Sequence, residues 1–255
     1  MNIKEIFNSL NINKNDKILV NSSILKILIE CQKANKKFEP NQIIDVIIEK
    51  IGITGTLLFP AYNWDFCKGI SFDYFNSKSQ SGSLGNISLK RKDFKRSKNP
   101  IYSFSVFGND KEHICSMSHT SCFGLESPFG YLIENKGKNL FIDIDYKDAF
   151  TFVHVAEEFV GVNYRYLKDF KGKYKNESNQ ETEDYYKMYV RDLNKVKCTI
   201  IDKGFDKILI ENNAYEKKII QGINFTIIDI NKAYNLMINE LKNSNSLIYP
   251  EKIKK

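Results

Sequence analysis

The sequence predicts an α/β protein in three layers, α/β/α, around a mixed central sheet, with an irregular and partly antiparallel C-terminal half. Three observations support this fold class. After a short helix, the chain begins with a strand, two helical stretches and a second strand. A strand pattern at 139–144 then leads into a helix that carries His154. After Gly161 the pattern changes to aromatic-rich segments that alternate like strands. We expect a single domain over residues 1–255, because no internal repeat or clear linker is visible.

The first sixty residues contain hydrophobic patterns of both helix and strand type. Isoleucines recur at helical spacing after Pro40, and Gly52 is suited to end that helix. Pro60 ends the second strand, because proline cannot donate to a sheet ladder. The expected elements are a helix at 3–10, a strand at 17–20 with a polar turn at 21–23, a helical stretch at 24–36, a helix at 40–52 and a strand at 56–59.

The rest of the chain begins with a long, loop-rich segment at 61–100, a length that indicates a functional loop system or an insert. The last amphipathic helix can be capped by Asp229 or Asn231. The expected elements are strands at 103–106 and 139–144, the His154 helix at 150–161, strands at 164–167 and 185–190 around an exposed loop at 175–183, strands at 207–210 and 225–228, a last helix through Leu236, Ile238 and Leu241, and a frayed tail at 251–255.

Composition narrows the function classes. The net charge is +7, but the lysines are scattered, so a small polyanionic ligand explains the charge as well as nucleic acid does. No apolar run approaches the ~20 residues that span a bilayer, and the first residues form an amphipathic pattern rather than a signal peptide. The five cysteines show no metal-type clustering and no zinc or iron–sulfur pattern, which favours free thiols in a cytoplasmic protein.

The segment 150–161 contains the strongest candidate for chemistry. His154 and Glu157 are three residues apart, so on a helix their side chains are neighbours. A carboxylate beside an imidazole fixes its tautomer and stabilises its protonated form, which is how a general base is usually built. Spacing alone favours the simpler interpretation, a pair on a helix surface with no chemistry. Other motifs in the chain favour the catalytic interpretation of this pair.

Several motifs occur in a fixed order between Val20 and Arg165. They are Val20-Asn21-Ser22-Ser23, Gly55 to Tyr62 with its proline, Phe72-Asp73, Gly82-Ser83-Leu84, Arg96-Ser97-Lys98-Asn99-Pro100, His119 with Phe123-Gly124-Leu125-Glu126-Ser127-Pro128, and Thr151 to Glu157. Together they resemble the aminoglycoside 3-N-acetyltransferase family, whose members move an acetyl group from acetyl-CoA onto an amine. The resemblance implies a family core at 1–165, additional strands and a last helix at 166–255, acetyl-CoA as co-substrate and no metal.

The resemblance also implies roles for particular residues. His154 would remove the amine proton, and Glu157 would orient the ring. The turn and helix start at Ser22, Ser23 and Ile24, with Arg96, Ser97 and Thr151, would bind the CoA donor, while Tyr62, Trp64, Asp65, His119 and Ser127 would line the acceptor site. Structural interpretations compete with these roles. Ser23 can be a helix cap, Arg96 part of a solvated charge run, Trp64 a loop anchor and His119 a buried, hydrogen-bonded residue.

Departures from the family pattern bear on the acceptor. Asn99 replaces the family histidine before the proline, Asn86 a usual glutamate and Asp143 a usual glycine. The segment 150–172 is more similar to the branch found with bacterial surface-polysaccharide genes, which is thought to acylate amino sugars. We therefore expect an amino sugar, nucleotide-linked and used in surface-glycan synthesis, as the acceptor. A homodimer is compatible with the sequence, which does not specify the oligomeric state.

Other functions remain open from the sequence. The nearest alternative is acetylation of an aminoglycoside antibiotic. A serine hydrolase that uses His154 and Glu157 lacks a Gly-x-Ser-x-Gly elbow. A route through an acyl-cysteine at Cys67, Cys115 or Cys122 has no recognisable base partner. A nucleic-acid binder driven by the +7 charge is the remaining class.

Overall fold

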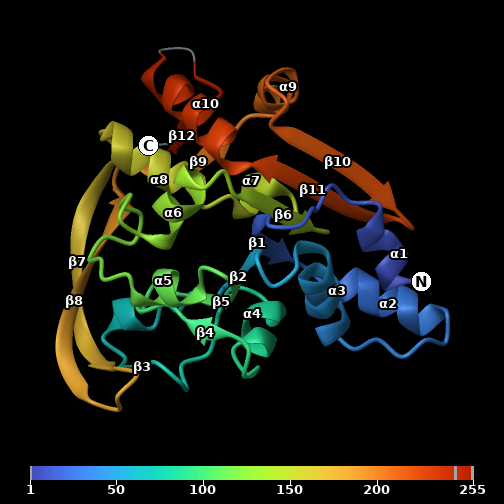
Figure 1. Cartoon of the computed structure of the whole chain (residues 1–255). Helices are drawn as coiled ribbons and strands as arrows, with labels where there is room; N and C mark the ends of the chain where they lie inside the picture. Colours follow the sequence, from blue (N-terminus) through green and yellow to red (C-terminus); the bar gives the residue numbers. More distant parts are fainter. Residues whose placement is uncertain (1, 244–245, 254–255) are drawn as a thin grey trace.

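A computed structural model describes residues 2–243 and 246–253, and a seven-stranded mixed sheet forms its centre (Figure 1). Three strands are parallel to one another, and each is a short hydrophobic run buried on both faces. The strand order is β10 (Tyr215–Ile220), β11 (Ile223–Asp229), β6 (Lys138–Ile142), β1 (Lys17–Ser22), β2 (Thr56–Pro60), β5 (Phe104–Gly108) and β4 (Lys95–Arg96). The strands β6, β1 and β2 are the parallel ones.

Two hydrophobic cores cover the two faces of this sheet. Side chains alternate between the faces of a strand, so Leu19 packs in one core while Ile18 and Val20 pack in the other. Leu58 and Phe141 share the core of Leu19. This division confirms the three-layer α/β/α arrangement.

Helices from different parts of the chain form the two outer layers (Figure 1). The core of Ile18 is covered by α1 (Ile3–Asn8), α2 (Leu25–Lys33), α3 (Asn41–Ile51) and α4 (Ser83–Ser88). The core of Leu19 is covered by α5 (Lys111–Ser116), α6 (Pro128–Glu134), α8 (Phe152–Val160), α9 (Gly204–Glu211) and α10 (Ile230–Lys242). None of the described helices is both long enough and apolar enough to cross a membrane.

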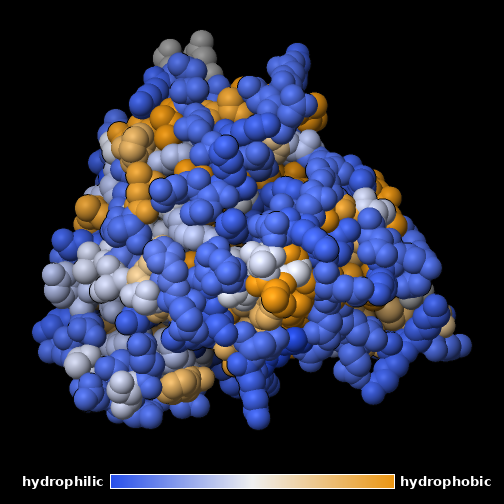
Figure 2. Space-filling view, viewed as in Figure 1, coloured by the Kyte–Doolittle hydropathy of each residue, from blue (hydrophilic) through white to orange (hydrophobic). Residues whose placement is uncertain are grey.

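Two smaller sheets complete the fold. A long, curved hairpin of β7 (Arg165–Lys175) and β8 (Glu181–Arg191) pairs with β3 (Phe72–Asp73), which follows the short helix η1 (Phe66–Lys68). The second sheet pairs β9 (Val196–Ile201) with β12 (Ile248–Lys252). Figure 1 shows the hairpin standing along one side of the molecule, next to the end of α8. The face in Figure 2 is largely hydrophilic, with hydrophobic residues in separate patches.

Most expected elements are present, and the exceptions have clear physical reasons. Residues 207–210 are not a strand but part of α9, in which Phe205 and Leu209 are buried one helical turn apart. The tail is not frayed from 251, because Glu251 and Lys252 pair with β9; residues 254–255 lie outside the described part of the chain. Asp229 caps α10 by accepting from the Lys232 N–H at 3.0 Å, as expected.

Candidate active site

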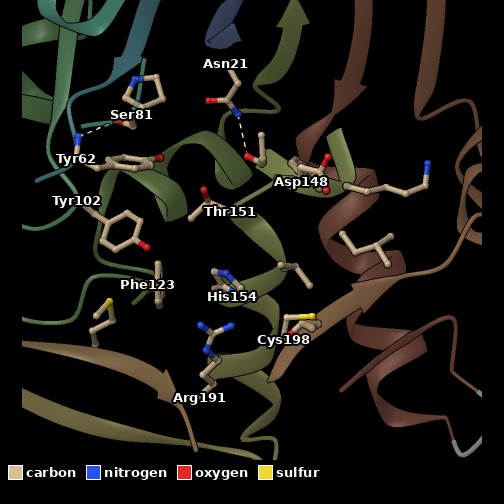
Figure 3. A pocket seen from close by; sticks show the side chains of 18 of the residues that line it. Asn21, Tyr62, Ser81, Tyr102, Phe123, Asp148, Thr151, His154, Arg191 and Cys198 are labelled. Atoms are coloured by element: carbon tan, nitrogen blue, oxygen red, sulfur yellow. Dashed lines mark hydrogen bonds between the residues drawn. The ribbon is translucent and has the colours of Figure 1, made fainter. Parts of the chain in front are cut away.

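A cavity of about 810 Å³ opens at the carboxyl ends of β1 and β2. The ends of parallel strands are where α/β proteins tend to form ligand sites. The cavity is lined by residues that follow β1 and β2, by the start of α8 and by the facing ends of β8 and β9. Figure 3 shows His154 at its centre, with Tyr62 and Tyr102 on one side and Cys198 on the other. The helix α7 (Tyr146–Ala149) contributes to the rim.

The local sequence places His154 on the cavity side of α8. Phe152, Val155 and Ala156 bury the opposite face of the helix in the core. Gly161 ends the helix with φ +71°, a left-handed conformation that glycine adopts without steric cost. The His154 side chain is 29% exposed to the cavity, and its ring centroid is 5.5 Å from that of Phe123. The expected helix is therefore confirmed.

His154 and Glu157 form a direct pair. The Nδ1 atom of His154 lies 2.7 Å from Oε2 of Glu157, whose side chain is fully buried. An ionised carboxylate only accepts hydrogen bonds, so Nδ1 carries the proton. The second ring nitrogen, Nε2, then holds a lone pair; among the described residues the ring makes only the Nδ1 contact with Glu157, and His154 lines the cavity. This tautomer is the one that a general base facing the cavity requires.

The electrostatic surroundings keep both groups in the forms that this pairing needs. Burial lowers the pKa of His154, and the positive charges of Arg165 and Arg191 lower it further, which outweighs the support from Glu157. Burial opposes ionisation of Glu157, but the hydrogen bond from His154 and the nearby charges hold its pKa below the ordinary value. At neutral pH the imidazole is therefore unprotonated and the carboxylate ionised.

Three further residues contact Glu157, and sequence reasoning missed their role. The Tyr164 hydroxyl donates to Oε1 at 2.9 Å, and the Thr199 hydroxyl donates to the same atom at 2.6 Å. The Arg165 Nε lies 2.7 Å from Oε2, an ion pair whose N–H direction is poor for a hydrogen bond. Thr199 is on the strand β9, 42 residues after Glu157 on the helix α8, so no sequence spacing relates the two.

Several residues expected in the site do line the cavity. Ser22 lies at the end of β1, and Thr151 caps α8 without a side-chain cap bond. Tyr62 and Trp64 follow β2 and stand with Tyr102 as an aromatic wall, with ring centroids 4.5 Å apart for Tyr62 and Tyr102 and 6.4 Å apart for Tyr62 and Trp64. The structure therefore brings these four predicted residues together with His154.

Three expected residues lie next to the cavity but do not line it. The Ser23 N–H donates to the Ile142 carbonyl at 2.9 Å, so it is committed to the sheet. Ile24, rather than Ser23, is the N-cap of α2, and it makes no side-chain cap bond. Asp65 forms an ion pair with Lys68 at 2.9 Å. We therefore do not retain Ser23, Ile24 or Asp65 in the proposed site.

Arg96 and Ser97 are internal structural residues in this fold, which corrects the expectation that they meet CoA phosphates. The Arg96 guanidinium is buried, donates to the Ala61 carbonyl and the Ser103 hydroxyl at 3.0 Å each, and covers the Phe72 ring at 4.6 Å. Ser97 is also buried, and its hydroxyl accepts from a backbone N–H of β5 at 2.8 Å. Neither side chain lines the cavity.

His119 and Ser127 are also placed elsewhere. The Nδ1 of His119 lies 2.8 Å from the Ser121 carbonyl, and the residue borders a separate cavity of about 220 Å³ beside the β7–β8 hairpin. Ser127 is fully buried and caps α6 by accepting from the Phe129 N–H at 3.2 Å. Both residues are buried, and neither lines the cavity that contains His154.

The residues that depart from the family pattern have structural roles here. The Asn99 side-chain oxygen accepts from the N–H groups of Ile101 and Tyr102 at 3.0 and 2.9 Å. Asn86 exchanges two hydrogen bonds with the Ser79 backbone, both at 2.8 Å. Asp143 has a positive φ of 49°. None of the three lines the cavity, so they leave the His154 pair intact.

The fold and the site define an α/β protein with a histidine–carboxylate pair beside a cavity of about 810 Å³. The sequence profile of the aminoglycoside 3-N-acetyltransferase family matches residues 19–242. The chain belongs to this family. It is therefore an N-acetyltransferase that takes its acetyl group from acetyl-CoA. No match was found among curated proteins.

Solved structures of similar fold agree with the family. AAC-IIIb in a binary complex with CoASH is 16% identical, with a TM-score of 0.75 and 94% of each chain covered. The YokD protein from Bacillus subtilis is 16% identical, with a TM-score of 0.74 over 95% of this chain and 93% of its own. AAC-VIa bound to sisomicin is 16% identical, with a TM-score of 0.74 over 94% of this chain and 96% of its own. At 16% identity, the similarity to these structures is a similarity of fold.

Proposed function

We propose that the enzyme acetylates an amino sugar by direct transfer, with His154 as general base. The observation that carries this proposal is the free Nε2 of His154 at the cavity, opposite an Nδ1 engaged by Glu157 at 2.7 Å. An amine at neutral pH is mostly protonated and attacks only after losing its proton. A histidine with a lowered pKa, unprotonated at pH 7, is suited to accept it.

The reaction balances without any further group. The ammonium form of the acceptor first releases one proton to solvent. The neutral amine nitrogen then attacks the thioester carbonyl while its next proton moves to Nε2 of His154. The tetrahedral intermediate then collapses, the carbon–sulfur bond breaks, and the thiolate of CoA leaves. The imidazolium returns its proton to that sulfur, which yields the amide and free CoA. Glu157 stabilises the transient imidazolium through Nδ1 without leaving its buried position.

Ser22 and Thr151 are the residues we retain for the donor. Both line the cavity between the end of β1 and the start of α8. Asn21 stabilises this corner by donating from its side chain to the Ala149 carbonyl at 3.0 Å (Figure 3). An acyl-cysteine route has less support, because burial raises the pKa of Cys67 to about 11 and that of Cys122 well above its ordinary value.

The charge of the cavity supports an anionic acceptor. Asp148 is the only carboxylate among the described residues that line it, whereas Lys147, Arg165 and Arg191 are cations. Lys147 pairs with Asp206 at 2.9 Å, and Arg165 pairs with Glu157. Arg191 has no carboxylate partner in the described part of the chain and donates only to the Lys197 carbonyl. Its guanidinium points toward the His154 ring in Figure 3.

These features fit a sugar that carries both an amine and a phosphate, as a nucleotide-linked amino sugar does. The aromatic wall of Tyr62, Trp64 and Tyr102 offers apolar faces against which a sugar ring can stack. Arg191 would meet the phosphate. We accordingly propose a role in surface-glycan synthesis. The five free cysteines support the expected cytoplasmic location.

The second candidate acceptor is an aminoglycoside antibiotic. The family match favours it, and the exposed Asp148 at the rim could attract an ammonium group. Aminoglycosides are polycations, however, and the uncompensated Arg191 opposes them. The test is to incubate the enzyme with acetyl-CoA and either acceptor class, and to follow thiol release. Faster turnover of nucleotide-linked amino sugars supports the proposal, whereas turnover of aminoglycosides alone would replace it with the alternative.

A further inference from the structure

The buried carboxylate of Glu157 is held by more than its histidine partner. Arg165, from the first residue of β7, lies 2.7 Å from Oε2, the same oxygen that His154 contacts. The exposed fractions of these two side chains are 7% for Arg165 and 0% for Glu157, so water screens their charges weakly. A buried charge is neutralised locally by an opposite charge beside it. The Arg165–Glu157 pair therefore weakens the negative electrostatic potential that Glu157 exerts on the His154 ring.

Arg165 is itself fixed by its surroundings. Its Nη1 donates to the Tyr189 carbonyl on β8 at 3.1 Å, and its Nη2 donates to the Thr199 hydroxyl on β9 at 3.1 Å. The Thr199 hydroxyl in turn donates to Oε1 of Glu157 at 2.6 Å. Three strands and one helix thus meet around a single carboxylate, and the guanidinium has little freedom to turn away from it.

The ion pair between Arg165 and Glu157 limits protonation of the His154 ring, which an unpaired carboxylate would favour. A lone buried carboxylate attracts a proton onto the neighbouring imidazole, and a protonated imidazole is no longer a base. When an arginine balances the carboxylate, the pair has no net charge. The carboxylate still accepts the Nδ1–H, but it no longer favours protonation at Nε2 as strongly.

We propose that Arg165, supported by Thr199, is a positioning residue that neutralises Glu157 and keeps His154 an unprotonated base with Nε2 toward the cavity. The inference rests on the proposed role of His154. Neither residue needs to touch the reacting atoms for this effect. Thr199 also explains why the C-terminal third of the chain matters to the site, because β9 supplies a hydroxyl that the family motifs do not include.

Three charged groups in the described part of the chain act on the His154 ring. Glu157 on α8 favours the protonated ring, while Arg165 on β7 and Arg191 on β8 oppose it, in addition to the effect of burial. Tyr164 also contacts Glu157, but burial raises its pKa above its ordinary value, so its hydroxyl stays neutral. Removing the Arg165 charge therefore leaves Glu157 uncompensated and raises the pKa of His154.

The test measures the protonation of His154 directly and needs no acceptor. The chain has three histidines, so the imidazole resonances can be followed by NMR between pH 4.5 and 8, and the His154→Ala spectrum assigns the relevant one. Arg165→Gln should move the His154 midpoint up by about one pH unit. Arg165→Lys, which keeps the charge, should restore most of that shift. Thr199→Val should move the midpoint in the same direction by less.

The matched control is Lys171→Gln on the same strand β7. Lys171 forms an exposed ion pair with Glu183 at 3.0 Å, and such pairs are screened by water. This control should leave the midpoint unchanged. The inference is overturned if Arg165→Gln and Thr199→Val are both folded by circular dichroism and their His154 midpoints equal that of the parent protein. If Arg165→Gln does not fold, the His154 midpoint in Thr199→Val decides.

The test of Arg165 can fail without the test of His154 as general base failing, and the reverse also holds. Normal turnover by His154→Ala would refute the general base while leaving the NMR result interpretable. An inactive His154→Ala together with an unmoved midpoint in Arg165→Gln would refute only the role of Arg165. A raised midpoint should also appear as a shift of the acid side of the rate profile to higher pH.

Discussion

Nδ1 of His154 and Oε2 of Glu157 lie 2.7 Å apart across one turn of α8, with the imidazole open to the cavity and the carboxylate fully buried. The helix therefore presents a base on its surface and the group that orients it in the core. A water-exposed pair at the same spacing would lack this asymmetry, because both side chains could rotate freely. The predictions below depend on this relationship and on the charges around it.

His154→Ala should reduce turnover by a factor of about 10² to 10⁴, the usual effect of removing a general base. The measurement is thiol release from acetyl-CoA at saturating acceptor. His113→Ala is the matched control, because His113 is exposed on α5 and lies outside the cavity. Turnover of His154→Ala near that of the control would remove His154 from the mechanism.

The rate should fall as pH drops through a value below 6.5, the ordinary pKa of histidine. The sign follows from the role of the ring: the unprotonated form is active, and burial with two nearby cations lowers its pKa. The quantity to measure is kcat/KM for acetyl-CoA at saturating acceptor, which reports groups that titrate before the donor binds. Acceptors whose amines differ in pKa should leave this limb in place. A limb at pH 7 or above that stays in place when the pKa of the acceptor amine is varied would contradict the lowered pKa of His154.

Arg191→Gln should raise KM for a nucleotide-linked amino sugar roughly ten- to a hundredfold, because a charge-assisted hydrogen bond to phosphate is lost. KM for acetyl-CoA should change little, since Ser22 and Thr151, the residues proposed for the donor, lie at the end of β1 and the start of α8, whereas Arg191 is on β8. Arg191→Lys should recover part of the affinity. An equal rise in KM for acetyl-CoA would show that Arg191 serves the donor instead.

Arg96→Lys should lower the free energy of unfolding by about 2–4 kcal/mol, because buried carbonyl groups lose their donors. Denaturant unfolding followed by circular dichroism measures this change. The surface variant Lys92→Ala is the control and should unfold like the parent protein. Under conditions where Arg96→Lys is folded, KM for acetyl-CoA should be unchanged. A raised KM with normal stability would return Arg96 to the CoA site.

Local patterns were sufficient for the elements that bury a clear face. The short hydrophobic runs of β1, β2 and β6 could be recognised, because strands buried on both sides need apolar residues throughout. The run Ile208-Leu209-Ile210 was misassigned as a strand for the same reason: a few consecutive apolar residues do not distinguish a buried helix from a strand. The packing of α9 against α10 in the tertiary structure favours the helical conformation of these residues.

The sequence by itself determined the five inner strands of the central sheet, the family, and the pair of His154 and Glu157, because residues three positions apart on one helix are neighbours. Only the tertiary structure decided which residues surround that pair. It turned Arg96, Ser97 and Ser127 inward to bond with the fold, and it brought Arg165 and Thr199 to Glu157 from separate strands. The reason is physical: helical spacing specifies contacts within a turn, whereas contacts between strands depend on how the whole chain packs.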